Sequence, residues 1–163
     1  MERYKMLRIL NHVFEEDFSE RESRITFIND EDIEEPSLSI DCIFCEKEIE
    51  NDFIRPIIGI DSIDVNTRDI DKLVGEAKQC EDFEQSEWEE DYLYFYDQEP
   101  FQNYEFKIVD VIGHRAHIVC TGLATLDSDE DPMTTAEFVW DTWLPIIENY
   151  SDWDEFGLDE PMN

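Results

Sequence analysis

Three cysteines and one histidine have the spacing of a metal site. Cys42 and Cys45 form a CxxC pair, and His117 and Cys120 form an HxxC pair. Two such pairs could supply the four tetrahedral ligands of a zinc ion. Cys42, however, lies in an alternating stretch typical of a strand, which would send Cys42 and Cys45 to opposite faces. We therefore predict that Cys42, Cys45, Cys80 and Cys120 are buried apolar thiols, with no zinc and no disulfide.

Acid–base chemistry would have to come from one of three histidines, His12, His114 and His117. A chain with 44 Asp and Glu residues places a carboxylate near any histidine by chance, so such proximity carries no information. The sequence contains no GxSxG, no HExxH and no glycine-rich phosphate loop, the motifs that would name a reaction. We therefore predict no catalytic residue, no cofactor and no enzymatic activity.

One acidic run has part of the pattern of a calcium loop. Asp127, Asp129 and Asp131 match positions 1, 3 and 5 of an EF-hand. Pro132 stands where that loop requires glycine, and Phe138 stands where it closes with glutamate. The pattern excludes an EF-hand and leaves only loose cation binding open, so we predict no metal site.

Charge is the strongest functional signal in the chain. Its 163 residues include 44 Asp and Glu against 12 Lys and Arg, a formal net charge of −32. Positions 79–106 contain ten acidic residues, positions 116–163 contain twelve, and neither segment contains a Lys or Arg. Solubility alone needs a net charge of only about 2 to 8 for a small domain. The excess predicts a basic protein partner, with solubility or salt adaptation as the plainer alternative, and it disfavours contact with nucleic acid, with a membrane or with a second copy.

Residues 84–97 combine this charge with aromatic side chains. Tryptophan and tyrosine are the side chains that most often anchor the centre of a protein interface. An acidic loop before a strand, with its tryptophan in the core, is the structural alternative. The partner-binding residues that we predict are Glu84, Glu87, Trp88, Glu89, Glu90, Asp91, Tyr92, Tyr94 and Asp97.

Composition predicts a folded domain despite the charge. The chain is 41% hydrophobic and 13% aromatic, enough to build a core that a disordered acidic chain lacks. Its length predicts one domain, residues 1–149, followed by an acidic tail, residues 150–163. The amino terminus has no uninterrupted apolar stretch typical of a secretory leader, so we expect a cytoplasmic protein, monomeric when free.

Helices are expected in the first half of the chain, between short strands. Apolar residues at helical spacing over residues 4–18 favour an amphipathic helix, although the alternation of Leu7 and Ile9 would also suit a strand. Residues 66–80 have the clearest helical pattern. Strands are predicted at residues 24–28, at 37–44 by strict alternation, and at 54–65 with breaks near Pro56 and Gly59.

The second half has the pattern of a β-meander. Alternating residues over 92–96, 104–110 and 116–120, with a turn at 113–114, predict successive antiparallel strands. A further strand at 135–144 follows an acidic turn at 127–131, because Pro145 disfavours a helix there. Together the elements predict an α+β domain, a mainly antiparallel sheet with two or three helices packed on it.

Residues 104–126 and 135–147 give the chain a resemblance to immunity proteins of bacterial toxin–immunity systems, including contact-dependent inhibition. The resemblance is one of sequence style, without a diagnostic motif and without family site residues. It implies a small acidic α+β inhibitor that binds a cognate toxin, commonly a nuclease, in the cytoplasm. The alternative with the same electrostatics is a phage or mobile-element DNA mimic that blocks a restriction, CRISPR or other host-defence complex.

Overall fold

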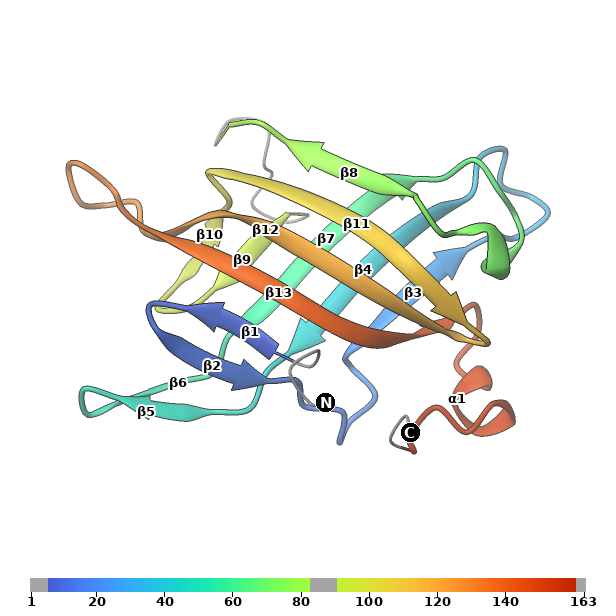
Figure 1. Ribbon diagram of the computed structural model, residues 1–163, viewed down its shortest axis with the longest axis horizontal. Coiled ribbons are helices and arrows are strands. Elements are labelled where there is room, and N and C mark those ends of the chain that lie inside the picture. The colour runs from blue at the N-terminus through green and yellow to red at the C-terminus, as the bar shows by residue number, and fades with distance from the viewer. Residues whose placement is uncertain (1–5, 83–90, 161–163) are drawn as a thin grey trace.

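The computed structural model describes residues 6–82 and 91–160, and in them the chain folds as two layers of β-strands (Figure 1). The front layer contains β1 (Met6–Ile9), β2 (His12–Glu15), β8 (Ala77–Cys80), β11 (Asn103–Ile112), β12 (Arg115–Asp127) and β13 (Thr134–Ile147). The back layer contains β3 (Arg24–Ile28), β4 (Ser37–Ile43), β7 (Ile57–Asp64), β9 (Tyr92–Tyr94) and β10 (Gln98–Pro100). Beside them lie a separate hairpin, β5 (Lys47–Ile49) and β6 (Asp52–Ile54), a 3-10 turn η2 (Ile70–Lys72) and a short helix α1 (Asp152–Glu155).

One strand joins the two layers into a continuous curled sheet. β13 pairs with β12 along its length, and its last residues, Ile146 and Ile147, pair in parallel with Ile25 and Thr26 of β3. The strands of the back layer cross behind those of the front layer (Figure 1). The inward side chains of both layers meet to form the core.

Most strands predicted from alternation are confirmed, but the predicted meander is wrong at its first strand, because β9 (Tyr92–Tyr94) pairs with β7 and β10 in the back layer and not with β11. In β4, Leu38, Ile40 and Cys42 are fully buried, and the residues between them face solvent in part. The meander β11–β12–β13 is antiparallel throughout, with Ile108 opposite Ile118. The strands at residues 24–28 and 135–144 are also present, as β3 and β13.

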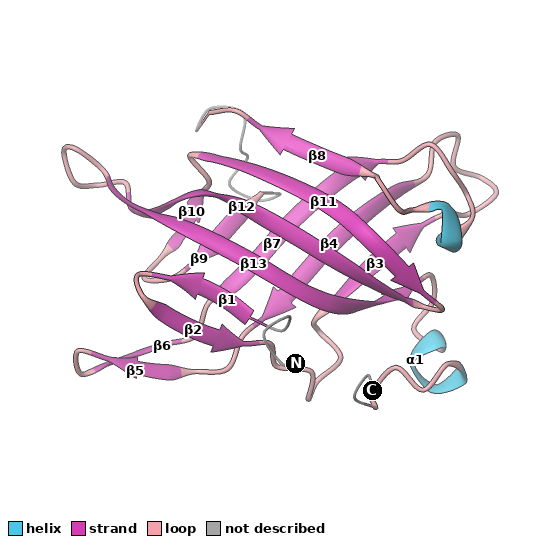
Figure 2. Cartoon of the chain, viewed as in Figure 1, coloured by secondary structure: helices cyan, strands magenta, loops and turns pink. Residues whose placement is uncertain are grey.

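The predicted α+β class is wrong, because the helical segments of the described residues are the four-residue α1 and the 3-10 turn η2, and the rest of the regular structure is strand (Figure 2). The segment 4–18 contains the β1–β2 hairpin. Leu10 and Asn11 at its turn have φ of 54° and 64°, the left-handed pair that a two-residue hairpin turn requires. The alternation of Leu7 and Ile9, which are both buried, was therefore the correct signal.

The clearest predicted helix, residues 66–80, is also wrong. Its apolar spacing is interrupted by Gly75, whose φ of 93° no continuous helix contains. Gly75 N–H donates to Ile108 O, and Ile108 N–H donates to Glu76 O, so the chain joins β11 here and continues as its edge partner β8. Val74, expected on the buried face, is 49% exposed. Pairing with β11 therefore overrides the local helical pattern.

The described part of the carboxyl-terminal segment, residues 150–160, packs against the body. Trp153 is fully buried and forms a small second core with Ile147 and Leu158. Arg21 forms ion pairs with Asp154, at 2.7 Å, and with Asp159. These contacts fix the segment against the carboxyl-terminal end of β13.

Candidate functional site

The predicted binding stretch falls partly within the structure. Glu84, Glu87, Trp88, Glu89 and Glu90 lie outside the described residues. The other four predicted residues, Asp91, Tyr92, Tyr94 and Asp97, belong to β9, to the residue before it and to the turn after it. Two of these four face solvent and two are held by the body of the protein.

Asp91 is an internal link between the layers. Its carboxylate, only 4% exposed as a residue, accepts hydrogen bonds from the Tyr104 hydroxyl at 2.8 Å and from Asp61 N–H at 3.2 Å. It also forms an ion pair with Lys78 Nζ at 3.1 Å, and that ammonium donates to Asp61 O at 2.9 Å. Burial and the bond to Asp91 raise the pKa of Tyr104. Asp91 therefore joins β8 and β11 to β7, and a partner could reach it only by opening this network.

Tyr92 covers a position where only glycine fits. Gly59 faces Tyr92 across the β7–β9 pair, and a Cβ on Gly59 would lie 2.5 Å from Tyr92 Cε1. Burial, and then the nearby Asp41 carboxylate, raise the pKa of Tyr92. Burial likewise raises the pKa of Asp41, and Arg24 opposite it acts in the other direction. The close packing fixes β9 beside β7 in the back layer.

The turn between β9 and β10 presents the exposed half of the predicted surface. Phe95 is 1% exposed and packs edge-on against Phe14 at 5.9 Å and against Tyr96 at 4.8 Å. Tyr94 and Tyr96 are 38% and 45% exposed, and Asp97 is exposed beside them. A buried anchor thus holds a carboxylate and two tyrosines towards solvent, and tyrosine is a side chain enriched at the centres of protein interfaces.

Glu99, next along the chain, is a buried carboxylate that sequence reasoning missed. It is 4% exposed and lies opposite Leu93 on the inward side of β10. One oxygen, Oε2, accepts from the Ser128 N–H and from the Ser128 hydroxyl, both at 2.9 Å. The other oxygen, Oε1, is buried and accepts no hydrogen bond among the described residues. Only the register of β9 with β10 places it inside, so the sequence pattern gave no signal for it.

Ser128 belongs to residues 127–131, which we call the acidic turn. This turn joins β12 to β13 and projects from the end of the front layer (Figure 1). Asp129 N–H donates to Asp127 Oδ1 at 2.9 Å, so the turn is ordered by its own side chain. Asp129, Glu130 and Asp131 are exposed. Glu99 therefore lies at the base of a turn that carries four further carboxylates.

A second acidic loop, between β3 and β4, is held by an arginine that bonds to the main-chain carbonyls of the loop and not to its carboxylates. The Arg68 guanidinium donates to the main-chain carbonyls of Asn29, Asp30, Ile33 and Glu34, the closest being Ile33 O at 2.6 Å. The exposed acidic residues of this loop are Asp30, Glu31, Asp32, Glu34 and Glu35. Arg68 thus fixes the conformation of the loop, and the carboxylates of the loop face solvent.

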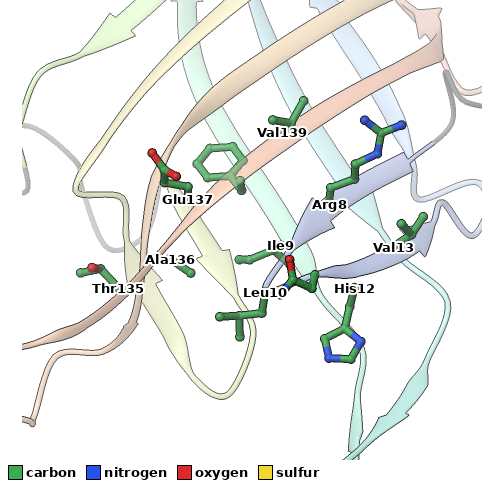
Figure 3. A pocket seen from close by; sticks show the side chains of 11 residues that line it. Arg8, Ile9, Leu10, His12, Val13, Thr135, Ala136, Glu137 and Val139 are labelled. Carbon is green, nitrogen blue, oxygen red and sulfur yellow. The ribbon is translucent and has the colours of Figure 1, made fainter.

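A hollow of about 490 Å³ lies where the β1–β2 hairpin turns away from β13 (Figure 3). Ile9 and Ala136 are buried parts of its apolar lining. Arg8, His12 and Glu137 also line it, and in Figure 3 their polar groups point in different directions. A small-molecule site usually has polar groups that converge on the ligand. The hollow therefore lacks the convergent polar groups of a polar small-molecule site.

The four cysteines are free thiols. Cys42, Cys80 and Cys120 are buried, as predicted, and Cys45 is exposed, contrary to a fully buried set. Burial is the main cause that raises the pKa of Cys42 well above its ordinary value, and the Glu16 carboxylate adds to it. Within residues 6–82 and 91–160, no group of three or more His, Cys, Asp or Glu side chains could hold a metal ion.

The histidines have three different settings. His117 Nε2 lies 2.6 Å from Asp141 Oδ1 on neighbouring strands of the front layer. His114, in the β11–β12 turn, stacks on Phe156 with ring centroids 3.6 Å apart. His12 lines the hollow beside β13. The predicted absence of catalysis stays a prediction.

No protein-family model matches the chain, and no curated protein or solved structure is significantly similar to it. The resemblance to immunity proteins therefore stays a prediction from sequence style. Among the described residues, no helix has the length and apolarity needed to cross a membrane.

Proposed function

We propose that this protein is an acidic inhibitory binding protein, which neutralises a cognate nuclease toxin by covering its basic surface as an immunity protein does. The main support is that its exposed acidic loops extend from a β-body in which several cations are hydrogen-bonded or ion-paired within the protein. Arg68 donates to loop carbonyls, and Lys78 is held inside by Asp91. Arg115 donates to the main-chain carbonyls of Gly157 and Glu160. The exposed carboxylates of the acidic loops are thus available to a partner.

The proposed mechanism is binding without catalysis. A surface with this charge steers a basic protein into contact, and association can reach about 10⁸–10⁹ M⁻¹s⁻¹ at low salt. Residues 84–97 then supply short-range contacts, in which Tyr94 and Tyr96 fill apolar recesses and the carboxylates occupy positions that substrate phosphates would take. Four free cysteines suit a reducing compartment, which supports action in the cytoplasm.

Co-expression with the product of the neighbouring gene tests the proposal, because an immunity gene lies directly behind its toxin gene. We expect that product to stop bacterial growth alone and to be tolerated, in a purifiable complex, when this protein is present. Replacing Glu87, Glu89 and Glu90 together by Gln should abolish protection at low expression. The matched control replaces three exposed carboxylates of the β5–β6 hairpin, Glu48, Glu50 and Asp52, by amides and should still protect.

A harmless neighbour, or a toxic one that this protein neither binds nor neutralises, would contradict the immunity proposal. Release of a host restriction or CRISPR complex from DNA by this protein, in the same cells, would instead support the DNA-mimic function. The two results are distinguishable because the first depends on the neighbouring gene and the second does not.

A further inference from the structure

Glu99 is a buried charge without a cation among its described contacts. Its two hydrogen bonds come from Ser128 and both reach Oε2. Oε1 is enclosed and accepts no hydrogen bond from the described residues. A buried carboxylate is costly unless it is paired as well as hydrogen-bonded, because it loses its hydration shell. An acceptor left in this state marks a place where a donor is expected.

The surroundings of Glu99 select a cationic donor. The carboxylate is directed to the acidic turn by its bonds to Ser128, and the turn adds Asp127, Asp129, Glu130 and Asp131. Five carboxylates in one short region attract a positive charge strongly and repel an anion. A guanidinium or ammonium side chain can hydrogen-bond to more than one carboxylate.

We propose that Glu99 and the acidic turn form the contact that receives an arginine or lysine side chain of the basic partner. This inference rests on the proposed function and names the chemistry of one contact in it. Because Oε1 is covered in the free protein, the incoming cation reaches it only when the turn shifts relative to β10. The Ser128 amide, which donates to the same carboxylate, reports that shift.

The test uses a hexa-arginine peptide as the probe and two-dimensional amide NMR of the full chain at low ionic strength. We expect the largest saturable shifts at Ser128 and Asp129. Glu99→Gln should weaken the peptide's affinity about tenfold, the effect of losing one close charge pair. The matched control Glu105→Gln, on the exposed outward side of β11, should change the affinity less than about twofold.

Several results would overturn the proposal. Equal losses in Glu99→Gln and Glu105→Gln, or shifts as large in the β3–β4 loop as at Ser128, would mean diffuse binding, and the proposed function would survive. No binding of hexa-arginine at all would contradict both. If Glu99→Gln does not fold, Asp129→Asn at the exposed turn replaces it, with an expected weakening of about threefold; an unchanged affinity in that variant would also overturn the proposal.

Discussion

A carboxylate in this protein can destabilise the fold by repelling other carboxylates, or stabilise it by pairing with a cation. Asp91→Asn tests which of the two effects dominates at Asp91. The 3.1 Å contact between Lys78 and Asp91 has a gross Coulomb energy of about 5 kcal/mol at an effective dielectric constant of 20. Breaking a buried pair typically costs about 3–5 kcal/mol, and Lys78, with a side chain 26% exposed, places this pair at the lower end. We expect a loss of about 3 kcal/mol and a melting temperature lower by about 6–12 °C. Thermal and urea unfolding monitored by circular dichroism measure both quantities.

The matched control is Asp97→Asn, which removes the same charge from an exposed position. We expect it to change the unfolding free energy by no more than about 0.5 kcal/mol. A double-mutant cycle of Asp91→Asn with Lys78→Met should give a coupling of at least about 1.5 kcal/mol. If Asp91→Asn were neutral or stabilising like the control, Asp91 would be one more repelling charge and the reasoning from its contacts would be refuted.

Three further predictions concern packing, loop order and pH. Gly59→Ala should cost about 1–3 kcal/mol in unfolding free energy, because its Cβ would meet the Tyr92 ring, and the cost should shrink in a Tyr92→Leu background. Arg68→Lys should increase amide hydrogen exchange in the β3–β4 loop, because one ammonium cannot replace a guanidinium that donates to four carbonyls; unchanged exchange would show that the loop orders itself. Burial raises the folded-state pKa of Asp41 above its ordinary 3.8, so the folded chain binds more protons above that pH and stability declines as pH rises through this window. Asp17, whose pKa is lowered by its bonds from Ser19, loses its contribution only below 3.8, so the melting temperature should decline as pH rises from 3.8 through the folded-state pKa of Asp41. The opposite trend in differential scanning calorimetry would contradict that sign.

The sequence predicted strands where one face is buried along a whole segment. In β4 and in the first halves of β11 and β12, buried and more exposed residues alternate because each inward residue meets the opposite layer, as Ile40 and Ile118 do. The sequence-based prediction failed where pairing with a distant strand decides the conformation. Residues 77–80 are extended because β11 offers an edge, and the parallel pair of Ile146 with Ile25 joins segments more than a hundred positions apart. No local pattern contains that information.

The candidate site also depends on contacts between segments that are distant in the sequence. Composition identified the acidic and aromatic stretch, in which Tyr94 and Asp97 are exposed, and its role in binding stays a prediction. It could not separate Asp91 and Glu99, which are turned inward, from their exposed neighbours. That separation depends on Lys78 and Ser128, which reach these carboxylates from other strands or turns.

The central claim, that the charge of this surface captures a basic protein, is tested most directly by association kinetics with the product of the neighbouring gene. We predict that the association rate constant, measured by surface plasmon resonance, falls at least about tenfold between about 50 and 300 mM salt, while the dissociation rate changes much less. Replacing Glu87, Glu89 and Glu90 by Gln should flatten this dependence, and Trp88→Ala should mainly accelerate dissociation. An association rate independent of salt, with the three-residue variant equal to the unmodified protein, would contradict the claim.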